Sequence, residues 1–255
     1  MRLLVDIGNT RLKWGLADQG EIMATGVLVN SHISSQVLID TWQALVSPQL
    51  IALSCVNSPQ IIELISSAAT FLWPHSPVIK AQSLASQCGV RNAYEQPEKL
   101  GVDRWLALIA AHHSYHQTLC IVDCGTAITV DVMTGDGNHQ GGLICPGLTL
   151  MRHSLAHGTH QLPLSEQNYT VGLANSTESA IFSGILSAAC GLIERVIAQQ
   201  PKPIQLILTG GDAGIISTQL ACEAIIDDNL VLRGLIYVSE EYAVKIPSLA
   251  STVIL

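Results

Sequence analysis

Apolar runs and polar turns alternate along this chain in a pattern that occurs twice. In each half, three β-type runs are separated by short polar turns, most of which contain glycine, and this predicts an antiparallel meander. The runs cover 2–7, 11–17 and 21–28 in the first half and 118–124, 127–133 and 140–145 in the second. The repetition predicts a duplicated chain.

Helix-type and strand-type patterns alternate after each meander, which is typical of an α/β fold built twice. The predicted helices cover 33–46, 59–72, 98–115, 147–156, 175–199 and 234–244, and a short one follows Asp212. The predicted strands cover 50–55, 77–80, 204–209 and 229–232, and 81–96 and 158–174 are predicted loops. We expect an N-terminal half at 1–116 and a C-terminal half at 117–255.

Composition excludes several classes of function. The chain has 255 residues, 48% of them hydrophobic and 13% charged, so it is globular. Its net charge of −8 disfavours nucleic acid and anionic membranes as partners. Seven cysteines without a C-x-x-C motif indicate thiols in a reducing cytosol, and no apolar run is long enough to predict a membrane span. We therefore expect a cytoplasmic protein.

The duplication is clearest in one short sequence motif. Asp6-Ile-Gly-Asn-Thr10 and Asp123-Cys-Gly-Thr126 each follow an apolar strand and precede a second one. Such a hairpin tip presents backbone N–H groups and hydroxyls beside a carboxylate, which suits phosphate oxygens and their cation. A single copy is more simply an Asx turn, but two copies favour a nucleotide site. Lys13 and Thr129, on the following strands, are either phosphate contacts or ordinary strand residues.

A second group of residues lies around the start of the helix predicted at 98–115. Asp103 is either a partner of the helix dipole or a general base, and the adjacent Arg104 could bind a substrate carboxylate in a bidentate manner. Tyr94 either lines a pocket or covers the core. Thr177 either binds substrate or caps the long helix, as Asn175 or Ser176 could also do.

Four stretches of the chain together resemble type III pantothenate kinase, a member of the acetate kinase, sugar kinase, Hsp70 and actin superfamily. They are Asp6–Gly15, Pro97–Trp105, Asp123–Asp131 running on to Gly141–Gly147, and Thr209-Gly-Gly-Asp-Ala213. The resemblance implies duplicated ribonuclease H-like (actin-like ATPase) domains. It also implies ATP-dependent phosphorylation of pantothenate to 4′-phosphopantothenate, the first step of coenzyme A synthesis, by a homodimer.

The resemblance assigns roles residue by residue. Asp103 matches the general base. Pantothenate contacts are implied for Tyr94, Gly101, Val102, Asp103, Arg104 and Thr177. ATP contacts are implied for Asp6, Ile7, Gly8, Asn9, Thr10, Arg11, Leu12, Lys13 and Thr126, and the glycines Gly210 and Gly211 match the adenosine motif. Asp123 matches a ligand of the monovalent cation, K⁺ or NH₄⁺. We expect Asp6 to contact the Mg²⁺ that accompanies ATP.

Two alternatives remain. The chain could be another small-molecule kinase of the superfamily, acting on a sugar, acetate or polyphosphate, although the Gly101–Arg104 segment argues against this. It could instead be a non-catalytic ATP-binding regulatory module, although the carboxylates Asp6, Asp103 and Asp123 are intact, which argues against a loss of catalytic activity. A substrate panel and a test of turnover would separate the three readings.

Overall fold

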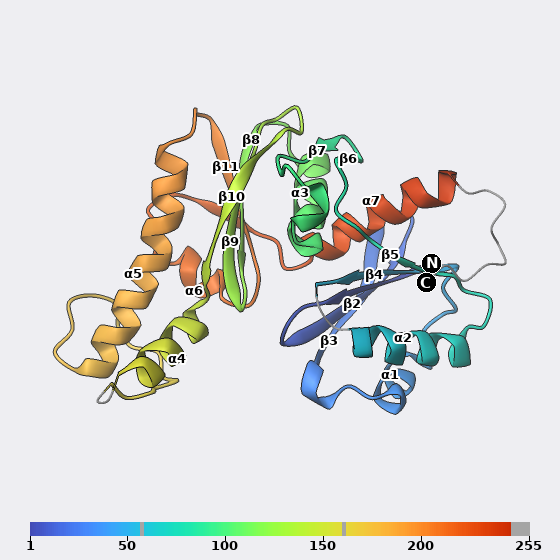
Figure 1. Ribbon diagram of the computed structural model, residues 1–255, viewed down its shortest axis with the longest axis horizontal. Coiled ribbons are helices and arrows are strands. Elements are labelled where there is room, and N and C mark those ends of the chain that lie inside the picture. Colours follow the sequence, from blue (N-terminus) through green and yellow to red (C-terminus); the bar gives the residue numbers. More distant parts are fainter. Residues whose placement is uncertain (57–58, 160–161, 246–255) are drawn as a thin grey trace. The chain divides into compact units, whose positions relative to one another are not determined.

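The computed structural model describes residues 1–56, 59–159 and 162–245 and divides into two compact units (Figure 1). The first unit consists of Met1–Ser114 and the segment that begins at Asn229, and the second consists of Tyr115–Asp228. The units therefore do not coincide with the halves expected at 1–116 and 117–255. The difference arises because the C-terminal helix packs with the first unit.

The first unit is a mixed sheet with helices on both faces. Its helices and strands are β1 (Arg2–Ile7), β2 (Arg11–Asp18), β3 (Glu21–Val29), η1 (Asn30–His32), α1 (Ser35–Trp42), β4 (Leu50–Cys55), α2 (Pro59–Leu72), β5 (Val78–Lys80), β6 (Ser86–Gln87), β7 (Val90–Arg91), η2 (Pro97–Lys99), α3 (Val102–Ser114) and α7 (Leu230–Lys245). The sheet order is β3-β2-β1-β4-β5, and β6 and β7 form a separate hairpin.

Strand β1 is buried on both of its faces. Leu3, Val5 and Ile7 pack with α1 and α2 in one core, while Leu4 and Asp6 point to the opposite face because side chains alternate along a strand. Helix α7 covers part of that second face (Figure 1). The sheet thus presents Asp6 on its α7 side, at the end of β1.

Helices α3 and α7 approach each other unusually closely. A Cβ added to Gly234 of α7 would lie 2.2 Å from the carbonyl oxygen of Leu106 in α3, so only glycine fits there. This packing ties the C-terminal helix to the first unit.

The second unit repeats the plan of the first. Its elements are β8 (Thr118–Cys124), β9 (Ala127–Met133), β10 (His139–Pro146), α4 (Leu148–Gly158), α5 (Thr177–Ala198), β11 (Ile204–Thr209), α6 (Ala213–Ser217) and β12 (Ala224–Ile226). The sheet order β10-β9-β8-β11-β12 matches that of the first unit strand for strand, with the same directions. The predicted duplicated α/β fold is confirmed.

Helix α5 supplies much of the core of the second unit. Phe182, Leu186, Ala189 and Ile193 pack on β8 and β9, together with α4 and α6. By length and composition alone, α5 could cross a membrane, since it has 22 residues and a most apolar window of mean hydropathy 1.7. However, 44% of that window is buried inside the protein, and a core helix needs the same apolar composition.

One predicted strand is wrong. Residues 229–232 form the first turn of α7, where the N–H of Arg233 donates to the carbonyl of Asn229, and the last strand lies earlier, at β12. The run Leu-Val-Leu looked like a strand because α7 is buried on several sides in this region, so its first turns lack the amphipathic period of a surface helix.

Candidate active site

Asp6 is the middle member of a row of three side chains across the first sheet. It pairs with Lys13 on β2 and with Ser54 on β4, so the three side chains point to the same face. The Asp6 Oδ1 and the Ser54 hydroxyl are both buried, and no hydrogen bond of normal geometry satisfies either. The Asp6 carboxylate and the Ser54 hydroxyl could therefore bind a ligand or cation.

The electrostatics of this row connect it to the start of α3. Burial raises the pKa of Asp6 from 3.8 to about 7. The Ser54 hydroxyl lowers this pKa, the Asp103 carboxylate raises it, and Lys13 lowers it, each to a smaller extent than burial raises it. The charges of Lys13 and Asp103 thus both act on the Asp6 carboxyl.

The hairpin tip after Asp6 is held by two sets of backbone contacts. The Gly8 N–H donates to the Arg11 carbonyl at 3.0 Å. Asn30, which the sequence analysis missed, donates from its side chain to the Gly8 carbonyl at 2.8 Å and from its N–H to the Thr10 carbonyl at 3.0 Å. Asn9 and Thr10 at the tip are exposed.

Ile7 and Leu12, at the ends of the two strands, differ from the tip residues. Both side chains are fully buried in the core. Only their backbone atoms could therefore reach a nucleotide.

The turn at Gly101–Arg104 folds tightly around its aspartate. The Trp105 N–H donates to the Gly101 carbonyl at 3.0 Å, and the Arg104 N–H donates to Asp103 Oδ1 at 2.8 Å. A Cβ on Gly101 would lie 2.5 Å from that same oxygen. The glycine therefore gives the Asp103 carboxylate the room it needs to fold back over the turn.

Arg104 and Tyr94 form a pair beneath this turn. Arg104 is only 6% exposed, its Nη1 donates to the Tyr94 hydroxyl at 2.8 Å, and its guanidinium lies 5.6 Å from the centre of the tyrosine ring. The structure thus brings together the predicted residues Tyr94, Asp103 and Arg104. Because the guanidinium is buried and bound to Tyr94, part of its role is to fix the loop that carries the tyrosine.

Asn92 organises that loop and was not found from the sequence. Its side-chain nitrogen donates to the carbonyls of Leu84 and Pro97, each at 3.2 Å, and its Oδ1 accepts from the Tyr94 N–H at 3.0 Å. A half-buried asparagine in a long loop gives a periodicity search no signal.

A cavity of about 650 Å³ adjoins the Gly101–Arg104 turn within the first unit. Its volume falls in the usual range for small-molecule sites. It is formed by the end of β4, by the 82–85 loop and by η2 with the start of α3. The lining residues are Cys55, Val56, Gln82, Ser83, Leu84, Ala85, Pro97, Glu98, Lys99, Leu100, Gly101 and Val102.

The second unit has a row of side chains equivalent to that of the first. Asp123 on β8 pairs with Thr129 on β9 and with Thr209 on β11. Gly210 follows with a φ of +90°, and a Cβ on it would lie 2.4 Å from Asp123 Oδ1. The predicted residues Asp123 and Gly210 are therefore adjacent. The second row has a hydroxyl, that of Thr129, where the first has Lys13, and both rows have a hydroxyl at the other position, Thr209 or Ser54.

The two turns beside Asp123 are joined by backbone hydrogen bonds. The Asp212 N–H donates to the Cys124 carbonyl at 3.0 Å, and the Gly147 N–H donates to the Thr126 carbonyl at 2.9 Å. These bonds hold the Gly210-Gly211 turn and the Thr126 hairpin tip beside the same carboxylate.

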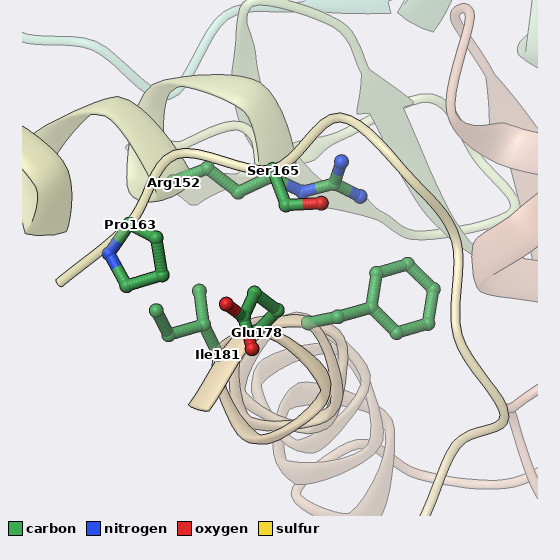
Figure 2. A pocket seen from close by; sticks show the side chains of 6 residues that line it. Arg152, Pro163, Ser165, Glu178 and Ile181 are labelled. Atoms are coloured by element: carbon green, nitrogen blue, oxygen red, sulfur yellow. The ribbon is translucent and has the colours of Figure 1, made fainter. Parts of the chain in front are cut away.

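Thr177 is the first residue of α5, and Ser176 is the N-cap, whose hydroxyl accepts from the Ser179 N–H. A small cavity lies beside this helix start (Figure 2), lined by Arg152, Pro163, Ser165, Glu178, Ile181 and Phe182. Its volume of about 10 Å³ is at the lower limit for a single water molecule. This cavity therefore cannot hold a substrate, and substrate binding by Thr177 stays a prediction.

The described residues contain no group of three or more His, Cys, Asp or Glu side chains placed to hold a metal ion. Mg²⁺ and K⁺ in kinases commonly rely on few protein ligands together with phosphate oxygens and water. The single carboxylates Asp6 and Asp123 fit that pattern.

In sequence, the chain is similar to one group of enzymes over almost its whole length. The family model described as type III pantothenate kinase matches residues 2–199. A type III pantothenate kinase from Nitrosococcus oceani is 37% identical over 255 residues, covering 94% of each chain. Another from Aromatoleum aromaticum is 39% identical over 246 residues, covering 95% of this chain and 99% of that one.

In fold, the chain is similar to solved structures of much lower identity. A Baf family protein from Campylobacter jejuni has a TM-score of 0.60 at 23% identity and covers 94% of this chain and 98% of its own. An activator of 2-hydroxyisocaproyl-CoA dehydratase from Clostridium difficile, with bound ADPNP, has a TM-score of 0.52 at 11% identity and covers 100% and 99%. At these identities the likeness concerns the actin-like fold alone.

Proposed function

We propose that this chain, which belongs to the type III pantothenate kinase family, transfers the γ-phosphoryl group of ATP to pantothenate and forms 4′-phosphopantothenate. The observation that carries this proposal is a cavity of about 650 Å³ in the first unit, lined by Gly101 beside Asp103 and by Cys55, which follows the partner of Asp6 on β4. Phosphoryl transfer to a small alcohol requires a phosphate site and an acceptor site near such carboxylates, and the hairpin tip after Asp6 and this cavity are our candidates for the two sites.

In the proposed reaction, Asp103 acts as the general base. A carboxylate oxygen of Asp103 takes the proton of the acceptor hydroxyl while the hydroxyl oxygen forms a bond to the γ-phosphorus. The bond from that phosphorus to the β–γ bridging oxygen breaks, and ADP leaves. Positioning supplies most of the catalysis in such transfers, and the tight Gly101–Arg104 turn fixes the carboxylate in place.

The nucleotide contacts are proposed for each unit separately. In the first unit, the exposed tip at Asn9 and Thr10 and the cation of Lys13 suit phosphate oxygens. In the second unit, Thr126 and the Gly210-Gly211 turn present a hydroxyl and open backbone at the carboxyl ends of strands. These contacts are the ones that the family resemblance implies.

The cation assignments follow from the two equivalent carboxylates. The Asp6 carboxyl is buried, with only the Ser54 hydroxyl and more distant charges acting on it, so it fits the Mg²⁺ that accompanies ATP, and Lys13 adds a positive charge on the same side. Asp123 lies among glycine turns and hydroxyl-bearing strands, which suits a weakly hydrated monovalent cation, K⁺ or NH₄⁺. When bound, these ions neutralise the charge of the transferring phosphoryl group.

We also propose that the protein is a cytoplasmic homodimer. The chain exposes large apolar side chains on the edge strand β10, with Leu143 47% and Ile144 63% exposed, and only 13% of its residues are charged. An uncharged, apolar edge favours coverage by another chain. Size-exclusion chromatography with light scattering measures the mass, and a mass of one chain at micromolar concentration contradicts the dimer.

A coupled assay tests the activity itself. Purified protein is incubated with ATP, Mg²⁺ and pantothenate, with and without K⁺, while ADP and 4′-phosphopantothenate are measured. We expect phosphorylation of pantothenate that depends on K⁺. Phosphorylation of a sugar or acetate but not of pantothenate would favour another kinase of the superfamily, and ATP binding without turnover would favour a regulatory module.

A further inference from the structure

Two large apolar side chains lie exposed where two loops meet at the cavity. Val56 follows β4 and Leu84 lies in the 82–85 loop, and each is 42% exposed. Both line the 650 Å³ cavity, as do the ring of Pro97 and the mostly buried Leu100 and Val102. Exposed apolar side chains that line a cavity commonly mark a surface that a ligand covers.

The cavity that contains this apolar wall, formed by Val56 and Leu84, adjoins the elements that carry the reacting groups. Val56 is two residues after Ser54, which pairs with Asp6 across the sheet. Gly101 also lines the cavity, and it lies against the Asp103 carboxylate. The cavity is therefore bounded by the elements that carry both carboxylates.

The chemistry of the acceptor fits this arrangement. The hydroxyl group of pantothenate that becomes phosphorylated is attached to a methylene group, and the next carbon carries two methyl groups. Whatever holds that hydroxyl near Asp103 must also accommodate the two methyl groups, because only one methylene separates the hydroxyl from their carbon. Apolar side chains that line the same cavity as Gly101, the neighbour of the Asp103 carboxylate, would bury them favourably.

We propose that Val56 and Leu84 bind the geminal dimethyl group of the acceptor and so make these two residues specificity determinants of the site. The proposal rests on the proposed function, because it takes pantothenate as the acceptor. The more polar lining residues Gln82, Ser83 and Lys99 leave the rest of the cavity suited to the amide and carboxylate end of the molecule. Substrates that keep the hydroxyl but lack the methyl groups should then react poorly.

The test compares two substrates in several variants. The kcat/KM ratio of pantothenate to its analogue without both methyl groups is measured for the wild type, Val56→Ala and Leu84→Ala. Since a buried methyl group contributes roughly a four-fold preference, we expect a wild-type ratio of about 10 or more. Each variant should lower that ratio by about three-fold or more, mainly through the KM for pantothenate, because the lost contact is with a non-reacting group.

Val46→Ala is the matched control. Val46 is 61% exposed and does not line the cavity, so its substitution should leave the ratio at the wild-type value. Thermal unfolding of each variant confirms that it is folded, and either cavity variant alone suffices if the other does not fold.

The outcomes separate this proposal from the one on which it rests. A wild type that phosphorylates pantothenate without preferring it over the analogue, or cavity variants that keep the full preference, would overturn the role of Val56 and Leu84 and leave the kinase activity intact. A wild type that phosphorylates neither compound would overturn the proposed function itself.

Discussion

Substitution of Asp6 by asparagine should change how the stability of the protein depends on pH. Asp6 Oδ1 is buried, and burial raises the pKa of the carboxyl from 3.8 to about 7. The native state therefore binds the Asp6 proton more tightly than the unfolded state does. As the pH rises from about 4 to about 7, the unfolded chain ionises first, and the native state loses stability relative to it.

The size of this effect follows from the shift. A difference of about 3 pKa units corresponds to roughly 4 kcal/mol lost in full above pH 7, at 1.36 kcal/mol per unit. About 2 to 3 kcal/mol of this loss falls between pH 5 and pH 8. In Asp6→Asn the loss is absent, so the free energy of unfolding of the variant minus that of the wild type should increase by this amount between the two pH values.

The assay is urea unfolding without nucleotide or divalent cation, followed by tryptophan fluorescence. All four tryptophans, at positions 14, 42, 73 and 105, lie in the first unit with Asp6, so the signal reports the relevant unit. Any pH-independent cost of the asparagine cancels between pH 5 and pH 8. The exposed Asp40→Asn variant controls for the loss of one surface carboxylate.

The reasoning would be refuted if the difference between Asp6→Asn and the wild type were the same at pH 5 and pH 8 to within about 0.5 kcal/mol, or decreased. Either result would mean that Asp6 ionises in the native state at its ordinary pKa. The Asp6 carboxyl would then not be the desolvated cation ligand proposed above.

Three further substitutions test other parts of the structure. Gly234→Ala should destabilise the protein by about 2 kcal/mol or more in thermal unfolding, because the added Cβ would lie 2.2 Å from the Leu106 carbonyl oxygen. The control Gly184→Ala has open space around it and should not destabilise the protein, so equal melting temperatures of the two variants would contradict the α3–α7 packing. Gly210→Ala, at a φ of +90° and 2.4 Å from Asp123 Oδ1, should raise the KM for ATP at least about ten-fold while the protein stays folded, and an unchanged KM would contradict the second-unit site. Tyr94→Phe removes the acceptor of the Arg104 hydrogen bond, so the KM for pantothenate should rise several-fold and stability should fall by about 1 kcal/mol; unchanged values of both would show that this pair does not support the acceptor site.

The sequence predicted those parts of the molecule that depend on local pattern. The two meanders, and the hairpin tips at the repeated Asp-x-Gly motif, could be predicted directly from strand periodicity and turn residues. The strand β4 agrees with its predicted range of 50–55. The positions of Asp6 and Lys13 on one hairpin and of Asp103 in the first turn of a helix also follow from local pattern.

The remaining features depend on tertiary contacts. The hairpin of β6 and β7 was missed because its turn places Cys88 at a φ of 48° before Gly89, and cysteine is not a typical residue for that conformation. The location of α7 in the first unit depends on the close approach at Gly234, which no local pattern encodes. Ser54 could have been noticed, since it lies near the carboxyl end of a strand parallel to β1, where α/β proteins bind ligands.

The central claim is that Asp103 is the base for phosphoryl transfer from ATP to pantothenate, and single-turnover kinetics of Asp103→Asn tests it most directly. Formation of 4′-phosphopantothenate is followed with saturating pantothenate, and ATP binding is measured separately. We predict that the variant binds ATP within about three-fold of the wild type while the rate of transfer falls at least about 10²-fold, the usual scale for general base catalysis. A variant that forms 4′-phosphopantothenate at near the wild-type rate would contradict the account.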